Sequence, residues 1–296
     1  MGLDNVNYHG WHGRLRSPWL ACLAIVRVAL LQVMRRKSYW LVLALALVHF
    51  LFIWAVIYAV TQLDLPPRAE EMFVEAVGFS AEAETVHDSG YIQFMNRQNI
   101  PVMMMLAFSG SLIVGSDFRL KSLPFYLSRR IDRAHYIVGK LLAVSTVIAM
   151  ITVIPALLLF VEYGAFTSSY RYWFSNWKLA LSILGYGAVM CAVLSIWLVS
   201  LSAYLQRMAP IAITWASLFV LSKLLVRQLA SMRDSDYWVL LDPWHNIQAV
   251  GRLCFGVYTD RHELDMAWAS FIILAFFTAI ALAALVHRVR AVDIVN

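Results

Sequence analysis

The chain has 296 residues, of which 61% are hydrophobic and 14% carry a charge, and its mean hydropathy is +0.68. Soluble globular domains are about 45–50% apolar and about 25% charged, so this composition excludes an ordinary soluble domain and is typical of a membrane protein. The net charge of +6 would suggest nucleic-acid binding in a soluble chain, but here its distribution along the sequence matters more than its sum.

The first apolar segment, residues 18–34, is interrupted by Arg27. A signal peptide is one interpretation, because Arg14 and Arg16 precede the segment. However, the apolar stretch before Arg27 is short, and we find no small-x-small cleavage site. We therefore predict an interfacial helix within a cytoplasmic N-terminal region, residues 1–38, in which the Arg27 side chain extends along the apolar surface to reach water.

The longer apolar segments predict membrane-spanning helices. A span needs about 20 mostly apolar residues, and lipid offers no hydrogen bonds to the backbone, so such segments are expected to be helical. Five segments meet this length, and one more is shorter but uncharged. We predict an all-α membrane protein whose transmembrane domain, residues 39–286, has six helices at about 39–62, 99–116, 138–161, 179–205, 209–226 and 266–286.

Between the fifth and sixth predicted spans, residues 227–265 form an external element. Its apolar part, residues 237–258, contains Asp242-Pro243, His245 and Arg252. A proline and ionisable residues at these positions argue against a full span. We predict a broken, partly immersed element, and the sequence leaves open whether it is re-entrant or lies on the surface.

The distribution of cations predicts the orientation. With six spans, both termini, the 117–140 segment and the 206–208 turn lie on one side, and these regions hold 15 of the 24 cations but only 4 of the 18 acids. The loop at 63–98 alone contains seven acids. Since cytoplasmic loops are rich in Lys and Arg, we predict a cytoplasmic N-terminus, a cytoplasmic 117–137 loop, a cytoplasmic tail at 287–296 and an external 63–98 loop.

Residues 117–140 read DFRLKSLPFYLSRRIDRAHYIVGK and carry six cations. This segment resembles the cytoplasmic loop between the second and third spans of bacterial ABC-transporter permeases of the type-2, exporter-like class. In that family the loop has an acidic residue, a G-x-L or S-x-L step, LSRP-I-S/D-R and Y-x-x-G-K. The matching residues are Asp117, Ser122-Leu123, Leu127-Ser128-Arg129, Ile131, Arg133, Tyr136 and Gly139-Lys140, whereas Arg130 stands where proline is common.

The six spans, the leading apolar segment and the large first loop also fit this family, so the resemblance covers nearly the whole chain. It implies a permease subunit of an ATP-driven exporter in the bacterial cytoplasmic (inner) membrane. The 117–137 loop would form a coupling helix that docks on a separate ATP-binding subunit, and a second permease subunit, identical or related, would complete the pathway. The implied ATPase-coupling residues are Asp117, Lys121, Leu123, Phe125, Tyr126, Leu127, Ser128, Arg129, Arg130 and Arg133.

The residues of the loop agree with docking on a protein. Phe125, Tyr126 and Leu127 form an apolar centre beside a basic rim, and such a centre is not expected in water unless a partner covers it. The alternative is a basic loop that rests on anionic lipid headgroups. Gly139-Lys140 does not belong to a phosphate-binding P-loop. We therefore expect ATP and Mg on the partner subunit, and no cofactor, metal or enzymatic activity on this chain.

Lys223 and Arg227 lie four residues apart on the fifth predicted span and hence on one helical face. Their side chains could extend to the outer membrane surface, or they could form a cationic ring at the outer mouth of a translocation pathway, with Glu162 as a partner. Two other functions stay open for the whole chain. One is a non-transporting scaffold or sensor driven by an ATPase, and the other is a membrane-embedded lipid-modifying enzyme, which would need a polar cluster that the sequence does not display.

Overall fold

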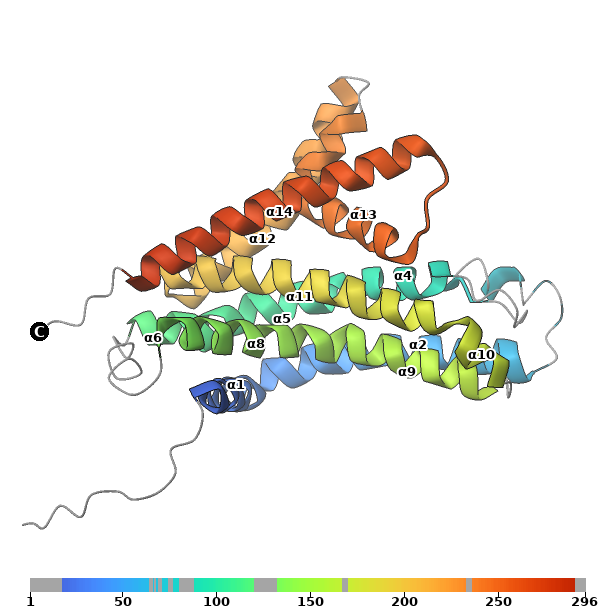
Figure 1. The fold of residues 1–296 in the computed structure, drawn as a ribbon, viewed down its shortest axis with the longest axis horizontal. Coiled ribbons are helices and arrows are strands. Elements are labelled where there is room, and N and C mark those ends of the chain that lie inside the picture. The colour runs from blue at the N-terminus through green and yellow to red at the C-terminus, as the bar shows by residue number, and fades with distance from the viewer. Residues whose placement is uncertain are drawn as a thin grey trace, which may run out of the picture.

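The computed structural model describes residues 18–63, 66, 68, 71–73, 77–79, 88–119, 132–166, 170–232 and 236–290. In this part the chain is all helical, as predicted, with no strand (Figure 1). In chain order the helices are α1 (Pro18–Met34), α2 (Lys37–Gln62), α4 (Asp88–Arg97), α5 (Asn99–Gly110), the π-helix η1 (Ser111–Gly115), α6 (Ser116–Arg119), α8 (Arg133–Ile151), α9 (Val153–Phe166), α10 (Tyr170–Ser175), α11 (Trp177–Leu205), α12 (Met208–Met232), the 3₁₀-helix η2 (Asp236–Leu241), α13 (Pro243–Phe255) and α14 (Arg261–Arg290).

Six helices or stacked helices within the described residues are long and apolar enough to cross a membrane, which confirms the predicted six-span architecture of a multi-pass membrane protein. They are Lys37–Gln62, Gly90–Phe118, Arg133–Phe166, Trp177–Leu205, Met208–Met232 and Arg261–Arg290. The shorter apolar helix α1 precedes them, as expected. The side of the membrane that each end faces stays a prediction.

The second span begins well before residue 99, where the hydropathy pattern placed its start. Helix α4 supplies the additional turns, and polar residues at its C-terminal end hydrogen-bond to other helices. The Tyr186 hydroxyl of α11 donates to Asn96 Oδ1 at 2.6 Å, and Gln98 Nε2 donates to the Ala46 carbonyl of α2 at 3.4 Å. Polar side chains that hydrogen-bond to neighbouring helices lower the local hydropathy without preventing burial, so the hydropathy pattern alone started the span too late.

The third span is broken at Thr152, between α8 and α9. Pro155 has no N–H to donate to the carbonyl four residues earlier, at Ile151, which interrupts the helical ladder at this point. Gly187 of α11 faces the break, and a Cβ atom added there would lie 2.3 Å from Val153 Cγ2. Helix α11 itself is continuous, so Gly187 permits close helix packing rather than a kink.

The predicted broken element between the fifth and sixth spans consists of η2 and α13. Asp242 accepts a hydrogen bond of 3.0 Å from the Trp244 backbone N–H, and Pro243 occupies the first turn, where its missing N–H costs nothing. Helix α13 packs on α11 and α14. Burial and the nearby Arg252 lower the pKa of His245, while Asp242 acts in the opposite direction. The depth of this element in the membrane stays a prediction.

The helices pack around α8 and α11, with α1 crossing α8 and with α12 and α14 on the opposite side of the bundle (Figure 1). Helices α6 and α1 and the C-terminal end of α14 lie toward one end of the molecule, and α10 lies at the other (Figure 1). The Tyr204 hydroxyl near the end of α11 donates to the Ala284 carbonyl of α14 at 3.0 Å. One end of the bundle therefore brings together both terminal helices and the two ends of the 120–131 segment.

Candidate functional site

The candidate site is the base of the 120–131 segment, where α6 leads out of the second span and α8 begins the third. Before α6 the helix widens into the π-helix η1, a geometry that often marks functional sites because it re-aims the backbone. Gly115, the last residue of η1, lies against Gln206. A Cβ atom added to Gly115 would be 2.9 Å from the carbonyl oxygen of Gln206. The second span is thus fixed against the turn that follows α11.

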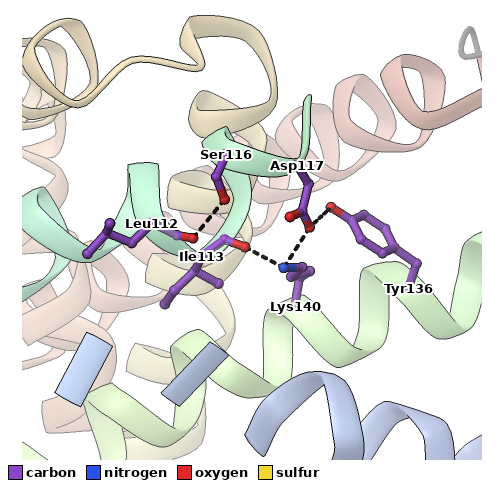
Figure 2. A network of polar contacts seen from close by, with 6 residues as sticks. All are labelled: Leu112, Ile113, Ser116, Asp117, Tyr136 and Lys140. Carbon is purple, nitrogen blue, oxygen red and sulfur yellow. Dashed lines mark hydrogen bonds and ion pairs between the residues drawn. The ribbon is translucent and has the colours of Figure 1, made fainter. Parts of the chain in front are cut away.

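Three residues that matched the family pattern meet at this base (Figure 2). The Lys140 ammonium lies 2.7 Å from Asp117 Oδ2, and the Tyr136 hydroxyl donates to the same oxygen at 2.9 Å. Tyr136 and Lys140 are four residues apart on α8, so they share one helical face. Lys140 also donates to the backbone carbonyl of Ile113 in η1. The contacts join α6 and η1 to the first turns of α8.

The ion pair is buried, since Asp117 is 9% exposed and Lys140 is 4% exposed. Removing two charges from water costs several kcal/mol per ion, and only additional hydrogen bonds with good geometry offset this cost. Tyr136 and the Ile113 carbonyl supply such bonds here. We call this group, Asp117, Tyr136, Lys140 and the Ile113 carbonyl, the loop-base network.

Helix α1 supports the loop-base network from the far side of α8. A Cβ added to Gly139 would lie 3.1 Å from Ile25 Cβ, so the glycine lets α1 approach closely. Cys22 Sγ donates to the His135 carbonyl at 3.3 Å, and the Trp19 and His135 rings are 4.6 Å apart. Burial raises the pKa of the Cys22 thiol, which favours its neutral form as a packing residue. Helix α1 therefore contacts the third span at the same level as the network.

Most of the predicted coupling residues, Lys121, Leu123, Phe125, Tyr126, Leu127, Ser128, Arg129 and Arg130, lie outside the described residues, and so does the predicted coupling helix. Asp117 lies within the network, and Arg133 is the half-buried first residue of α8. The structure thus describes the two ends of the predicted loop and brings them together.

The three predicted pathway residues are not brought together. Lys223 and Arg227 are exposed on α12, which packs mainly on α5, α11 and η2, whereas Glu162 is on α9, which packs mainly on α2, α8 and α11. Among the described residues, no ion pair joins Glu162 to either cation. The proposed partnership of Glu162 with Lys223 and Arg227 does not fit this structure, because similar predicted depth in the membrane does not place α9 beside α12.

Glu162 lies instead in an aromatic environment. It is 8% exposed, and neither carboxylate oxygen has a hydrogen-bond partner among the described residues. It interacts electrostatically with Tyr91 of α4. Ring contacts connect Tyr91 to Phe160 and Phe160 to Tyr172 of α10, with centroids 6.4 and 5.5 Å apart. A buried carboxyl group without a polar partner is costly to ionise unless another charge approaches it.

Sequence reasoning missed the contacts that create the site. The motif identified Asp117, Tyr136 and Lys140, but their separation along the chain gave no sign that they meet. The role of the Ile113 carbonyl follows from η1, and no residue pattern predicted a π-helix there. In the described part of the chain, no group of three or more His, Cys, Asp or Glu residues could hold a metal ion.

Comparison with known proteins does not assign the chain to a family. No protein-family model matches the chain, and none of the curated proteins compared with it matches.

Proposed function

We propose that this chain is the membrane-spanning permease subunit of an ATP-driven ABC transporter of the exporter-like class, and that the 117–137 loop couples it to a separate ATP-binding subunit. The loop-base network is the observation that carries the proposal. It contains three of the residues by which the sequence resembles the family, and all three fix the point where the loop joins the bundle. A loop that transmits force needs a rigid attachment of this kind.

The network suggests how coupling would work. A displacement of the loop acts first on Asp117 and on the start of α8, and the Lys140 ion pair makes these two points move together. From there the displacement reaches α5 through η1 and reaches α1 through Gly139. ATP-driven closure of the partner would thus move the second and third spans as a unit rather than bend them separately.

The other parts of the proposal follow from the sequence resemblance. ATP and Mg are bound by the partner, and this chain contributes no catalytic group. Two permease subunits, identical or related, form the pathway in the bacterial cytoplasmic membrane with their termini in the cytoplasm. A scaffold or sensor driven by an ATPase would use the same loop, and ATP-dependent movement of a substrate into vesicles separates the two functions.

Crosslinking tests the docking claim directly. A photoreactive amino acid at Tyr126 is expected to capture a protein that a photoactivatable ATP analogue also labels. Leu127→Ala is expected to reduce the amount of that protein recovered in complex, because truncating a buried apolar anchor costs about 2 kcal/mol or more. Lys121→Gln serves as the control and should change recovery little, because a charge at an interface rim contributes mainly to association rate.

Two outcomes would contradict the docking claim. One is capture at position 126 of lipid alone. The other is a Leu127→Ala chain that binds the ATPase as the unmodified chain does, while neutralising Arg129 and Arg133 abolishes membrane association of the loop. The second outcome is expected if the loop rests on anionic lipid headgroups.

A further inference from the structure

An open groove of about 920 Å³ lies between α11, α12, η2, α13 and α14, away from the loop-base network. Its walls follow helical spacing. Helix α11 contributes Trp197, Ser200, Leu201, Tyr204 and Leu205, and α14 contributes a matching face from Ile273 to Ala281. The volume is near the upper end of the range for ligand sites, about 300–1,000 Å³.

The groove presents apolar surface to its occupant, and no charged side chain is among the described residues that line it. Two polar atoms of its aromatic walls have hydrogen-bond partners within the protein. Trp197 Nε1 donates to Thr278 Oγ1 at 3.1 Å, and the Tyr204 hydroxyl donates to the Ala284 carbonyl. Trp215 Nε1 and Asn246 Oδ1 are buried and inaccessible to solvent. The groove therefore suits a hydrocarbon chain better than a polar molecule.

The position and length of the groove point to the bilayer as the source of that chain. Its rim residues Leu218, Phe277 and Ile280 are 41–54% exposed, so it opens sideways between two spans. Trp197 and Leu205 are eight helical steps apart, which corresponds to about 12 Å. This length compares with about 15 Å for half of the hydrocarbon core. It lies along the half of α11 that ends at the Gln206-Arg207 turn.

A cation stands at the same end of the groove. Arg288 of α14 lies over the ring of Tyr204, 5.6 Å from its centroid, and Tyr204 is itself a groove residue. Among the described residues no acidic side chain pairs with Arg288, and its buried Nε has no hydrogen-bond partner. A guanidinium group binds phosphate oxygens with favourable charge and geometry.

We propose that the groove holds an acyl chain of a membrane phospholipid whose phosphate binds Arg288. The apolar walls accommodate the chain, the sideways opening admits it from the bilayer, and the arginine fixes the headgroup at the end near Gln206-Arg207. The site is separate from the loop-base network, and the proposal does not depend on the transport function.

Photolabelling by a lipid tests the proposal. The protein is reconstituted into phosphatidylcholine vesicles that contain a small fraction of phosphatidylglycerol with a diazirine in one acyl chain. After illumination, mass spectrometry maps the labelled residues. We expect adducts on groove residues such as Ser200 and Thr214. Ala281→Phe fills the groove and should reduce these adducts several-fold, and Thr214→Phe should do the same from the α12 wall.

Two matched controls lie on the same helix. Ala283 is exposed and follows Ala281 by two residues, and Arg290 is exposed and follows Arg288 by two residues. Two residues correspond to about 200° around the helix, so each control points away from its test position. Ala283→Phe and Arg290→Gln should leave labelling of the groove unchanged, whereas Arg288→Gln should reduce it several-fold. Adducts on the outer faces of α2 and the thermal unfolding temperature report whether each variant is folded.

Three results would overturn the proposal. Unlabelled groove walls in the unmodified protein would mean that another protein surface, such as a second copy, covers the groove. Labelling that Ala281→Phe and Thr214→Phe do not change would place the lipid elsewhere. The third result is that Ala281→Phe abolishes labelling of the groove while Arg288→Gln leaves it unchanged. The groove would then hold an apolar chain whose headgroup does not contact Arg288.

Discussion

The Lys140 ammonium lies 2.7 Å from the Asp117 carboxylate and joins the end of the second span to the start of the third. Both side chains are buried, so the pair contributes specificity and rigidity at this place rather than a large net stability. Its position at the base of a loop with a proposed docking role makes it the first target for mutation.

A double-mutant cycle tests the coupling of these two residues. Asp117→Asn and Lys140→Met should each lower the free energy of unfolding by about 3–5 kcal/mol, because each leaves one buried charge without its partner. The double variant should lose less than the sum of the two. Denaturant unfolding of the chain in detergent micelles measures all three values.

A pair at the start of α8, in which the acidic member is exposed, provides the control for this cycle. Asp132 is 86% exposed and lies 3.8 Å from His135, so Asp132→Asn should change the free energy of unfolding by less than about 1 kcal/mol. Single variants of Asp117 and Lys140 that destabilise no more than this control would show that the ion pair is open to water in the working protein.

The six spans were predictable because each is a long apolar run. The broken element between the fifth and sixth spans was predictable because Asp242-Pro243 is both a helix cap and a helix stop. The start of the second span was not predictable, because Asn96 and Gln98 hydrogen-bond to other helices, which a hydropathy scale does not consider. That Glu162 lies among other helices than Lys223 and Arg227 was not predictable for a related reason. Depth in a membrane can be estimated from sequence, but the order of helices around the bundle depends on side-chain packing.

Thiol labelling tests the predicted orientation. In a background without Cys22, Cys191 and Cys254, a cysteine placed at Glu82 should react with a membrane-impermeant reagent in intact cells, and one placed at Ser128 should react only after the membrane is opened. The reverse pattern would overturn the assignment of the basic loop to the cytoplasm.

Gly187 and Gly185 form a matched pair on α11 for testing close helix packing. A Cβ at position 187 would lie 2.3 Å from Val153 Cγ2, whereas at position 185 the nearest atom is Cys254 Sγ at 3.8 Å. Gly187→Ala should therefore destabilise the protein by about 1–3 kcal/mol through overpacking. Gly185→Ala should be neutral or stabilising by up to about 1 kcal/mol, because alanine favours a helix. Thermal unfolding measures both, and Val153→Ala should rescue only Gly187→Ala.

Replacing Glu162 should raise the stability of the protein but lower its function. Its carboxyl group is buried and has no hydrogen-bond partner among the described residues. Glu162→Gln should therefore raise the free energy of unfolding at neutral pH by roughly 1–3 kcal/mol, because folding no longer has to bury a charge or take up a proton at this position. Because no ion pair joins Glu162 to Lys223 in the described structure, the effects of Glu162→Gln and Lys223→Gln should add within about 0.5 kcal/mol.

Transport into vesicles then distinguishes a functional carboxylate from a structural one. A charge kept inside a spanning segment at a cost in stability is expected to serve function, so the more stable Glu162→Gln protein should transport less. Loss of stability in Glu162→Gln, together with a non-additive effect of Lys223→Gln, would mean that α9 and α12 approach each other in the working protein and that the two residues form the ion pair expected from the sequence.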